Sequence, residues 1–347
     1  MTISLVIIVI LMLAVIFVNG WTDAPNAIAT AVSTRVITPS AAVKMAVVMN
    51  FLGVLIMTVI SPKVADTLSK IIVIQKGQEE DALVVLAAAM FAIVIWATAA
   101  WYFGIPTSES HALIAGVTGA AIALGGFDSI SRPQWMLVLV GLLISSVLGF
   151  FSGWLSVKGI EKAFRRVRRK TADKVFHFGE MFAAAMMAFL HGAQDGQKFI
   201  GIFLLGFYYY GITNPEFSFA PERLADGTFA TSPLLIIICS LFMGIGTSVG
   251  GYRIIKAVGM DMVKLEKYQG FASDMAASFC LLLSTLTGIP VSTTHTKTTA
   301  IMGVGASKRI SAVNWLVARD MILAWVLTFP GCGLIAFLMA KLFLKMF

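Results

Sequence analysis

Long apolar stretches alternate with short polar loops along the chain, from Ile3 to the C-terminus. A helix needs about 20 mostly apolar residues to cross a lipid bilayer, and roughly ten stretches reach that length. The pattern predicts an all-α integral membrane protein that crosses the bilayer several times.

Two of these apolar stretches carry a polar motif in their middle. The first motif reads Asn-Gly-Trp-Thr-Asp-Ala-Pro-Asn at 19–26, and the second reads His-Gly-Ala-Gln-Asp-Gly-Gln-Lys at 191–198. Their acidic residues, Asp23 and Asp195, are 172 positions apart. The match indicates that the chain contains two related halves.

A second pair of motifs supports this duplication. Pro-Thr-Ser-Glu-Ser-His at 106–111 matches Pro-Val-Ser-Thr-Thr-His at 290–295, which lies 184 positions later. Each motif leads into a segment of small residues, at 115–120 and at 300–305. Duplicated polar motifs inside apolar spans are typical of secondary transporters, whose halves often have inverted membrane topologies.

The duplication divides the chain into three parts. We expect a first transmembrane repeat at 1–157, a basic loop at 158–177 and a second transmembrane repeat at 178–347. Because each half is expected to cross the bilayer an odd number of times, the second repeat would be inverted relative to the first.

Glycine and proline residues are expected to interrupt the helices at both Asp-centred motifs. These residues are Gly20, Pro25, Gly192 and Gly196. Backbone without helical hydrogen bonds is tolerated at membrane depth only where it is buried in protein or lines a wet cavity. The two motifs therefore predict broken helices whose free carbonyl groups face a cation site.

The two Pro-containing motifs predict helix starts, since Ser and Thr are favoured N-caps. A helix N-terminus presents free N–H groups and about half a positive charge, which suits an oxyanion. Two such termini, with their hydroxyl groups, would form a polar cup around a tetrahedral anion. The hydroxyl residues of this predicted cup are Thr107, Ser108, Ser110, Ser292, Thr293 and Thr294.

Acidic residues near the bilayer centre predict a cation site. An ionised Asp costs about 2.5 to 3.5 kcal/mol there, and membrane proteins keep such residues to pair with a cation, to face a cavity or to carry protons. Asp23 and Asp195 are in this position, and Glu109 adds a further carboxylate. Asn26 and Gln194 would supply more oxygen ligands. We therefore predict a cation-binding or coupling site, with a sodium ion held by Asp23, Asn26 and Asp195.

Composition and charge agree with a membrane protein. Hydrophobic residues make up 58% of the chain and charged residues only 13%, which excludes an ordinary soluble surface. Of the 26 basic residues, eight lie between Lys158 and Lys174, so positive charge is concentrated in this one loop. Such a loop is typically cytoplasmic, and no nucleic-acid partner is expected. We expect a multi-pass protein of the cell membrane with its N-terminus outside.

The histidines and one further acid are open to two interpretations each. His111 and His295 end the Pro-containing motifs, and a structural hydrogen bond is favoured over contact with the anion. His191 would either relay protons or orient its helix. Asp274 begins the span that leads to Pro290, where an interfacial position and a functional role are both open.

The Asp-centred motifs and the Pro-Val-Ser-Thr-Thr-His segment resemble those of the inorganic phosphate transporter (PiT) family, from Asn19 to about Arg309. The resemblance implies an inverted-repeat secondary transporter with broken helices and re-entrant helical hairpins. It also implies a symporter, usually a homodimer, that moves phosphate with sodium or protons. Asp23, Asn26 and Asp195 would belong to the cation and substrate region, and the hydroxyl residues to the phosphate cup. No cofactor is expected beyond the coupling ion, sodium or a proton.

Lys198 breaks the symmetry between the halves, because it occupies the position that Asn26 holds in the first half. One hypothesis is that its ammonium group replaces a bound cation in the second half. The alternative is that Lys198 pairs directly with phosphate or with Asp195.

Three other functions fit the sequence less well than phosphate transport: an intramembrane enzyme, an anion channel and a transporter of another oxyanion. An intramembrane enzyme built on Ser108, Ser110, His111 and Asp195 would explain neither the duplication nor the helix breaks, so no enzyme is expected. An anion channel would not need midplane carboxylates. Sulfate or another oxyanion is the closest alternative substrate, but phosphate carries a proton that a carboxylate can accept as a hydrogen bond, whereas sulfate does not.

Overall fold

The structure is a computed structural model that describes residues 3–105, 107–225 and 228–346. These residues form thirteen α-helices and no β-strand. The longer helices are α1 (Ile3–Thr22), α3 (Pro39–Ile60), α5 (Glu79–Phe103), α7 (Arg132–Ala163), α8 (Arg169–Thr213), α11 (Lys267–Thr287) and α13 (Trp315–Met346). The shorter ones are α2 (Ala24–Ser33), α4 (Lys63–Ser69), α6 (Glu109–Gly125), α9 (Pro233–Ser248), α10 (Tyr252–Lys256) and α12 (Thr293–Lys308). Single turns of tighter or wider helix are η1 (Gly126–Ser129), η2 (Ala257–Asp261) and η3 (Ile310–Ala312).

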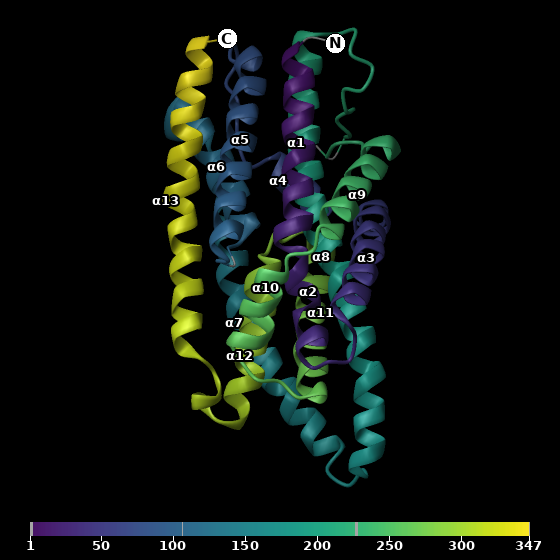
Figure 1. Ribbon diagram of the computed structural model, residues 1–347. Coiled ribbons are helices and arrows are strands. Elements are labelled where there is room, and N and C mark those ends of the chain that lie inside the picture. The colour runs from purple at the N-terminus through teal and green to yellow at the C-terminus, as the bar shows by residue number, and fades with distance from the viewer. Residues whose placement is uncertain (1–2, 106, 226–227, 347) are drawn as a thin grey trace.

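The helices form an elongated bundle whose two chain ends lie together (Figure 1). The basic segment 158–177 lies at the opposite end, where it consists of the end of α7, the turn at 164–168 and the start of α8, so most of this predicted loop is helical. The 45-residue helix α8 runs most of the length between these ends. Helices α5 and α6 lie in the half nearer the termini, whereas α11 and α12 lie in the half nearer the basic loop.

Seven helical segments in the described residues are long and apolar enough to cross a membrane, or eight if the bent pair α9 and α10 counts as one span. The sequence-based count of roughly ten is therefore too high. Helix α12 has only 16 residues, and the polar motif in the middle of α8 lowers that helix's hydropathy. The all-α membrane fold itself is confirmed, while the inverted relation of the two halves stays a prediction.

The outer faces of the long helices are apolar. Leu143 and Phe151 on α7 and Leu327 and Leu338 on α13 are all more than half exposed. Side chains of this kind need lipid as their solvent. Together with the spans, they make the chain a multi-pass membrane protein.

The predicted helix break is present in the first half and absent in the second. Helix α1 ends at Thr22 and α2 begins at Ala24, so Asp23 lies at the interruption, with Pro25 in the first turn of α2. Helix α8 continues without a break through Gly192 and Gly196, so the second predicted break is wrong. This motif has no proline, and its glycines serve packing: a Cβ on Gly192 would collide with the backbone of α3.

The small-residue segments of both halves allow close helix packing. Gly119 of α6 lies against the backbone of Gly333 in α13, and Gly303 of α12 lies against the backbone of Phe150 in α7. Small residues at such contacts let membrane helices approach closely. Helices α6 and α12 are thus held tightly against long spans, which fixes the positions of their N-terminal ends.

Candidate functional site

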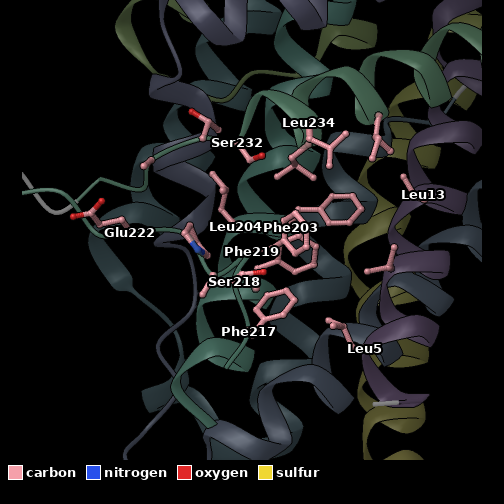
Figure 2. A pocket seen from close by; sticks show the side chains of 18 residues that line it. Leu5, Leu13, Phe203, Leu204, Phe217, Ser218, Phe219, Glu222, Ser232 and Leu234 are labelled. Carbon is pink, nitrogen blue, oxygen red and sulfur yellow. The ribbon is translucent and has the colours of Figure 1, made fainter. Parts of the chain in front are cut away.

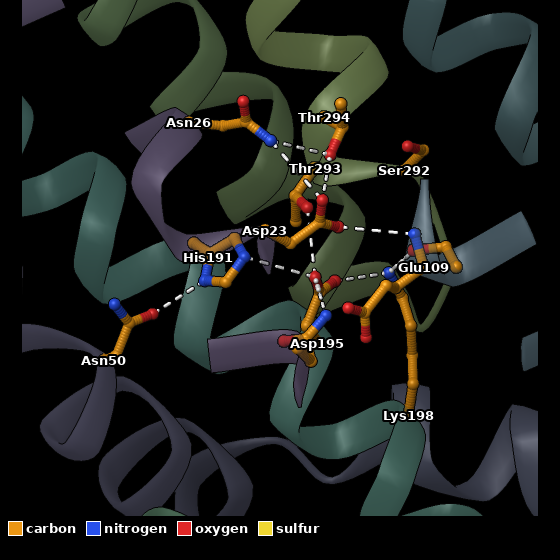
Figure 3. Close-up of polar contacts among 12 residues, drawn as sticks. Asp23, Asn26, Asn50, Glu109, His191, Asp195, Lys198, Ser292, Thr293 and Thr294 are labelled. Atoms are coloured by element: carbon orange, nitrogen blue, oxygen red, sulfur yellow. Dashed lines mark hydrogen bonds and ion pairs between the residues drawn. The ribbon is translucent and has the colours of Figure 1, made fainter. Parts of the chain in front are cut away.

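Asp195, in the middle of α8, is the most heavily bonded acid in the molecule's centre (Figure 3). Its carboxylate accepts a hydrogen bond from Lys198 Nζ at 2.7 Å. Thr293 Oγ1 donates to it at 3.1 Å and Asn19 Nδ2 at 3.3 Å. These donors come from three helices, so Asp195 ties α1, α8 and α12 together.

Lys198 lies one turn from Asp195 on α8 and is 1% exposed. Besides Asp195, its ammonium group donates to Ser110 Oγ and to the carbonyl of Val291, both at 2.6 Å. Lys198 therefore bonds the start of α6 and the segment before α12 at once. Of the alternatives raised by the sequence, direct pairing with Asp195 is what the structure contains.

Asp23 lies at the break between α1 and α2 and faces the start of α12 (Figure 3). Thr294 Oγ1 donates to its carboxylate at 2.9 Å, and Asn26 Nδ2 lies 3.4 Å from it. The backbone N–H of Glu109, at the first turn of α6, donates to Asp23 at 3.4 Å. A carboxylate from one half is thus bonded to helix starts from both halves.

Glu109 adds a third buried carboxylate, only 1% exposed. Thr22 donates a hydrogen bond to its Oε1, while its Oε2 receives none from the described residues. The side-chain carbonyl oxygens of Asn19 and Asn26 are also buried and lack a donor among these residues. Several oxygens in the centre are therefore available to a cation.

The starts of α6 and α12 meet at their N-caps. Ser108 caps α6 by accepting from the backbone N–H of His111, and Ser292 caps α12 by accepting from that of His295. The two serine hydroxyl groups are hydrogen-bonded to each other at 2.8 Å. The predicted helix starts are confirmed, and the N-terminal ends of the two helices lie side by side.

Gln194 and Thr107 make none of the hydrogen bonds described above. Gln194 turns toward α11, where it donates to the carbonyl of Ile289 and accepts from Thr285. Thr107 is half-buried in the loop before α6. Pro106 lies outside the described residues.

The sequence analysis left Asn19, Thr22 and Asn50 without a role in the site. Asn50 is a fully buried amide on the mostly apolar buried side of α3, and its Oδ1 lies 2.7 Å from His191 Nδ1. A single amide inside an apolar span was the signal that could have identified it. Asn19 and Thr22 lie within the first polar motif, but only the fold shows which acids they bond.

His191 connects Asn50 to Asp195. The Asn50 amide nitrogen donates to the carbonyl of Ala46, so its oxygen is the acceptor and His191 Nδ1 carries the hydrogen. His191 Nε2 then lies 3.3 Å from Asp195 and bonds it only when a proton is present between them. The geometry serves both interpretations of His191, as a helix-orienting residue and as a proton-holding one.

His111 and His295 pack against each other with their ring centroids 4.3 Å apart. His111 Nδ1 lies 3.2 Å from the carbonyl of Trp325, and His295 stacks on the Trp325 ring at 3.7 Å. These contacts lie on the α13 side, which agrees with the structural role favoured from the sequence.

Asp23, His191 and Asp195 offer ligand atoms that lie within 4.8 Å of one another, a spacing that fits a cation. The three central carboxylates and Lys198, if ionised, leave an excess of two negative charges in a fully buried region. Cations or protons must neutralise such an excess in a buried region. An anion can bind there only if they enter with it. The centre is therefore suited to bind opposite charges together.

A separate pocket of about 410 Å³ lies at the end of the bundle nearer the termini (Figure 2). Apolar side chains dominate its lining, among them Leu13, Phe203, Leu204 and Phe219. A pocket of this composition does not stabilise an oxyanion.

Comparison with known proteins gives a consistent result. The family model described as "Phosphate transporter family" matches residues 19–336. A protein of Bacillus subtilis (strain 168) named "Probable low-affinity inorganic phosphate transporter" is 36% identical over 325 residues, covering 94% of this chain and 92% of the relative. A protein of the same name from Rhizobium meliloti (strain 1021) is 36% identical, covering 92% of this chain and 90% of the relative.

One solved structure has the same fold. It is titled "The sodium-dependent phosphate transporter" and covers 99% of this chain and 100% of its own, with a TM-score of 0.87 and 20% sequence identity.

Proposed function

The chain belongs to the phosphate transporter family, and from that premise we propose that it is a symporter that carries inorganic phosphate together with a cation. The family is one of transporters and not of enzymes, in agreement with the sequence analysis. We further propose that the coupling ion is sodium or a proton and that the protein lies in the cell membrane.

The proposal rests on one observation. The N-termini of α6 and α12 meet beside three buried carboxylates. Helix starts with free N–H groups attract an oxyanion, whereas Asp23, Glu109 and Asp195 repel one. The two requirements are met together only when cations neutralise the carboxylates as the anion enters. An anion channel would have no use for these acids.

The polar groups of the predicted cup support an anion site. Ser108 and Ser292 bond each other, Thr293 donates to Asp195, and Thr294 donates to Asp23. An arriving phosphate would exchange these partners for its own oxygens, and its P–OH group would donate to a carboxylate. Sulfate has no such proton at neutral pH, which favours phosphate.

We assign the coupling cation, sodium or a proton, to the region of Asp23. Asn26 and Glu109 contribute buried oxygens that lack a donor among the described residues, and Thr294 contributes a hydroxyl. At the equivalent place in the second half, Lys198 pairs with Asp195, so its ammonium group would take the place of a second cation.

Uptake of radiolabelled phosphate into proteoliposomes tests the proposal. Vesicles are given an imposed sodium or proton gradient, with excess sulfate as competitor and Asp195→Asn as the inactive control. We expect accumulation above equilibrium that sulfate does not block and that Asp195→Asn abolishes. Uptake that never exceeds equilibrium under either gradient, or that sulfate competes away, contradicts the proposal.

A further inference from the structure

A second cluster of buried charges lies away from the phosphate centre, on the side of the basic loop. It consists of Glu180 on α8, Asp274 on α11 and Lys297 on α12, each with an exposed fraction of 0%. Thr30 of α2 completes it, with its hydroxyl oxygen 2.8 Å from both carboxylate oxygens of Asp274 and its single O–H donating to that carboxylate. Asp274 is therefore buried inside the protein, and its depth in the bilayer stays a prediction.

Helix α2 shows where this cluster lies. Thr34, one turn beyond Thr30, lines a cavity of about 910 Å³ beside the basic loop. Asn26, one turn before Thr30, bonds Asp23 and Thr294 in the phosphate centre. Since a helical turn rises about 5.4 Å, the cluster lies between the cavity and the centre, one turn from each.

The cavity, here called the basic-loop cavity, is lined by charged side chains of both signs. Its acidic lining residues are Glu161, Asp173 and Glu266. Its basic lining residues are Arg35, Arg169, Lys170 and Lys267. On α8, Phe176 lines the cavity and Glu180 follows one turn deeper. Glu180 is thus the first acid along α8 from the cavity toward the centre.

The charges in the cluster do not balance. Lys297 is ion-paired with Asp274 and also bonds Thr30 at 2.9 Å, so this pair is neutral. Glu180 remains as one carboxylate, and neither of its oxygens accepts a hydrogen bond from the described residues. The charged groups that face it are Asp274 and Lys297. An unpaired buried carboxylate is costly unless a cation or a proton neutralises it.

The geometry favours a proton over a metal ion. The place of a metal ion between Asp274 and Thr30 is already taken by the ammonium group of Lys297. Glu180 alone offers two oxygens, too few for a hard cation that takes about six. A single proton needs only one oxygen. Gly270 makes room for the group, because a Cβ there would lie 2.5 Å from Glu180 Oε1.

We propose that Glu180 is a proton-binding site on the path between the phosphate centre and the basic-loop cavity, and that its loading and release couple phosphate movement to a proton. One O–H bond breaks on a carboxyl group of the phosphate centre and one forms on a Glu180 oxygen as the proton passes between them, and the Glu180 O–H bond then breaks when the proton is released to water in the cavity. This inference rests on the proposed function. In membrane transporters, buried acids of this kind serve as proton relays.

The test uses the full chain in proteoliposomes and two measurements. The first is exchange of labelled phosphate at equal concentrations on both sides, which needs no net proton movement. The second is accumulation driven by a pH gradient, with a trapped pH dye reporting protons. For Glu180→Gln, which keeps the shape of a protonated carboxyl, we expect exchange within about twofold of wild type, accumulation at least tenfold lower and no proton signal.

Two further variants keep the result decisive. Glu180→Asp retains a carboxyl group and is expected to keep proton-driven accumulation. Glu161→Gln, a half-exposed acid at the rim of the same cavity, is the matched control and should behave as wild type.

The contrary outcomes are distinct. Equal proton-driven accumulation by Glu180→Gln and wild type overturns the inference, and so does equal loss of exchange in Glu180→Gln and Glu180→Asp, which would indicate a structural role. Accumulation by wild type under sodium alone overturns the choice of a proton. Absence of accumulation by wild type under any gradient instead contradicts the proposed symport.

Discussion

At the scale of single residues, the centre is stabilised by a network of ionic and polar contacts in which Lys198 and Asp195 each have several partners. Lys198 bonds Asp195, Ser110 and the Val291 carbonyl, and Asp195 in turn receives Thr293 and Asn19. Removing one partner of a buried ion pair costs about 3–5 kcal/mol, because the other charge remains without compensation. The stability of the protein therefore depends on which charges are removed together.

This gives a prediction for Lys198→Met. The substitution keeps the side-chain length but removes the ammonium group, so we expect a clearly lower midpoint of thermal unfolding in detergent. Adding Asp195→Asn removes the uncompensated charge as well. The double variant should be more stable than Lys198→Met alone, and a double variant that is less stable than either single one would contradict the pairing.

From the sequence, Asp23, Asp195 and the hydroxyl residues could be predicted as candidate site residues. Acidic and capping residues inside an apolar span are unusual and point to a functional site. The partners of these residues were not identifiable. Asn50 meets His191 across 141 positions, and Lys297 meets Asp274 between helices that only the fold brings together. Such contacts depend on how α3, α8, α11 and α12 pack, which no local pattern encodes.

At the scale of helices, a glycine can mark a helix break or a close helix contact, and the sequence alone does not distinguish the two. At 20–25 the glycine is accompanied by a proline, and the helix is interrupted at Asp23. At Gly192 and Gly196 there is no proline, and the helix continues because the glycines admit the neighbouring α3. The helix starts at Ser108 and Ser292 were predictable because capping is a local interaction.

The packing of α12 on α7 leads to a prediction at this scale. In Gly303→Ala, the new methyl group would meet the backbone of Phe150, which cannot move aside as a side chain can. We expect α12 to shift, with lower thermal stability and lower phosphate uptake, since the start of α12 holds Ser292, Thr293 and Thr294.

The matched control is Gly159→Ala on α7, where a Cβ meets no atom within 4 Å. Alanine is favoured over glycine in a helix by up to about 1 kcal/mol, so this variant should be as stable as wild type or slightly more so. If both variants behave alike, the close contact does not matter to the helix pair.

At the scale of the whole molecule, both termini lie at one end and the basic loop at the other (Figure 1). The positive-inside rule predicts that the basic loop lies in the cytoplasm. The termini and the segment at 217–222, which lines the apolar pocket, would then face outward. The homodimer implied by the resemblance stays a prediction.

Labelling with a membrane-impermeant thiol reagent tests this orientation. Cysteines introduced as Val167→Cys and Phe219→Cys occupy exposed positions at opposite ends. In intact cells we expect only Phe219→Cys to react, and in inside-out vesicles only Val167→Cys. The native Cys239, Cys280 and Cys332 are buried, so the wild-type chain serves as the unlabelled control. The reversed pattern would show that the basic loop is outside.

The hydrogen bond between Ser108 and Ser292 matters for the part of the transport cycle in which the carrier returns without substrate. A carrier that concentrates its cargo must reorient empty, and buried groups stripped of partners would raise the barrier to that step. Here the hydroxyl groups bond one another or the nearby carboxylates, so these groups keep hydrogen-bond partners when no anion is bound. Because these hydroxyl groups do not lose their partners, they would add little to the barrier of the return step.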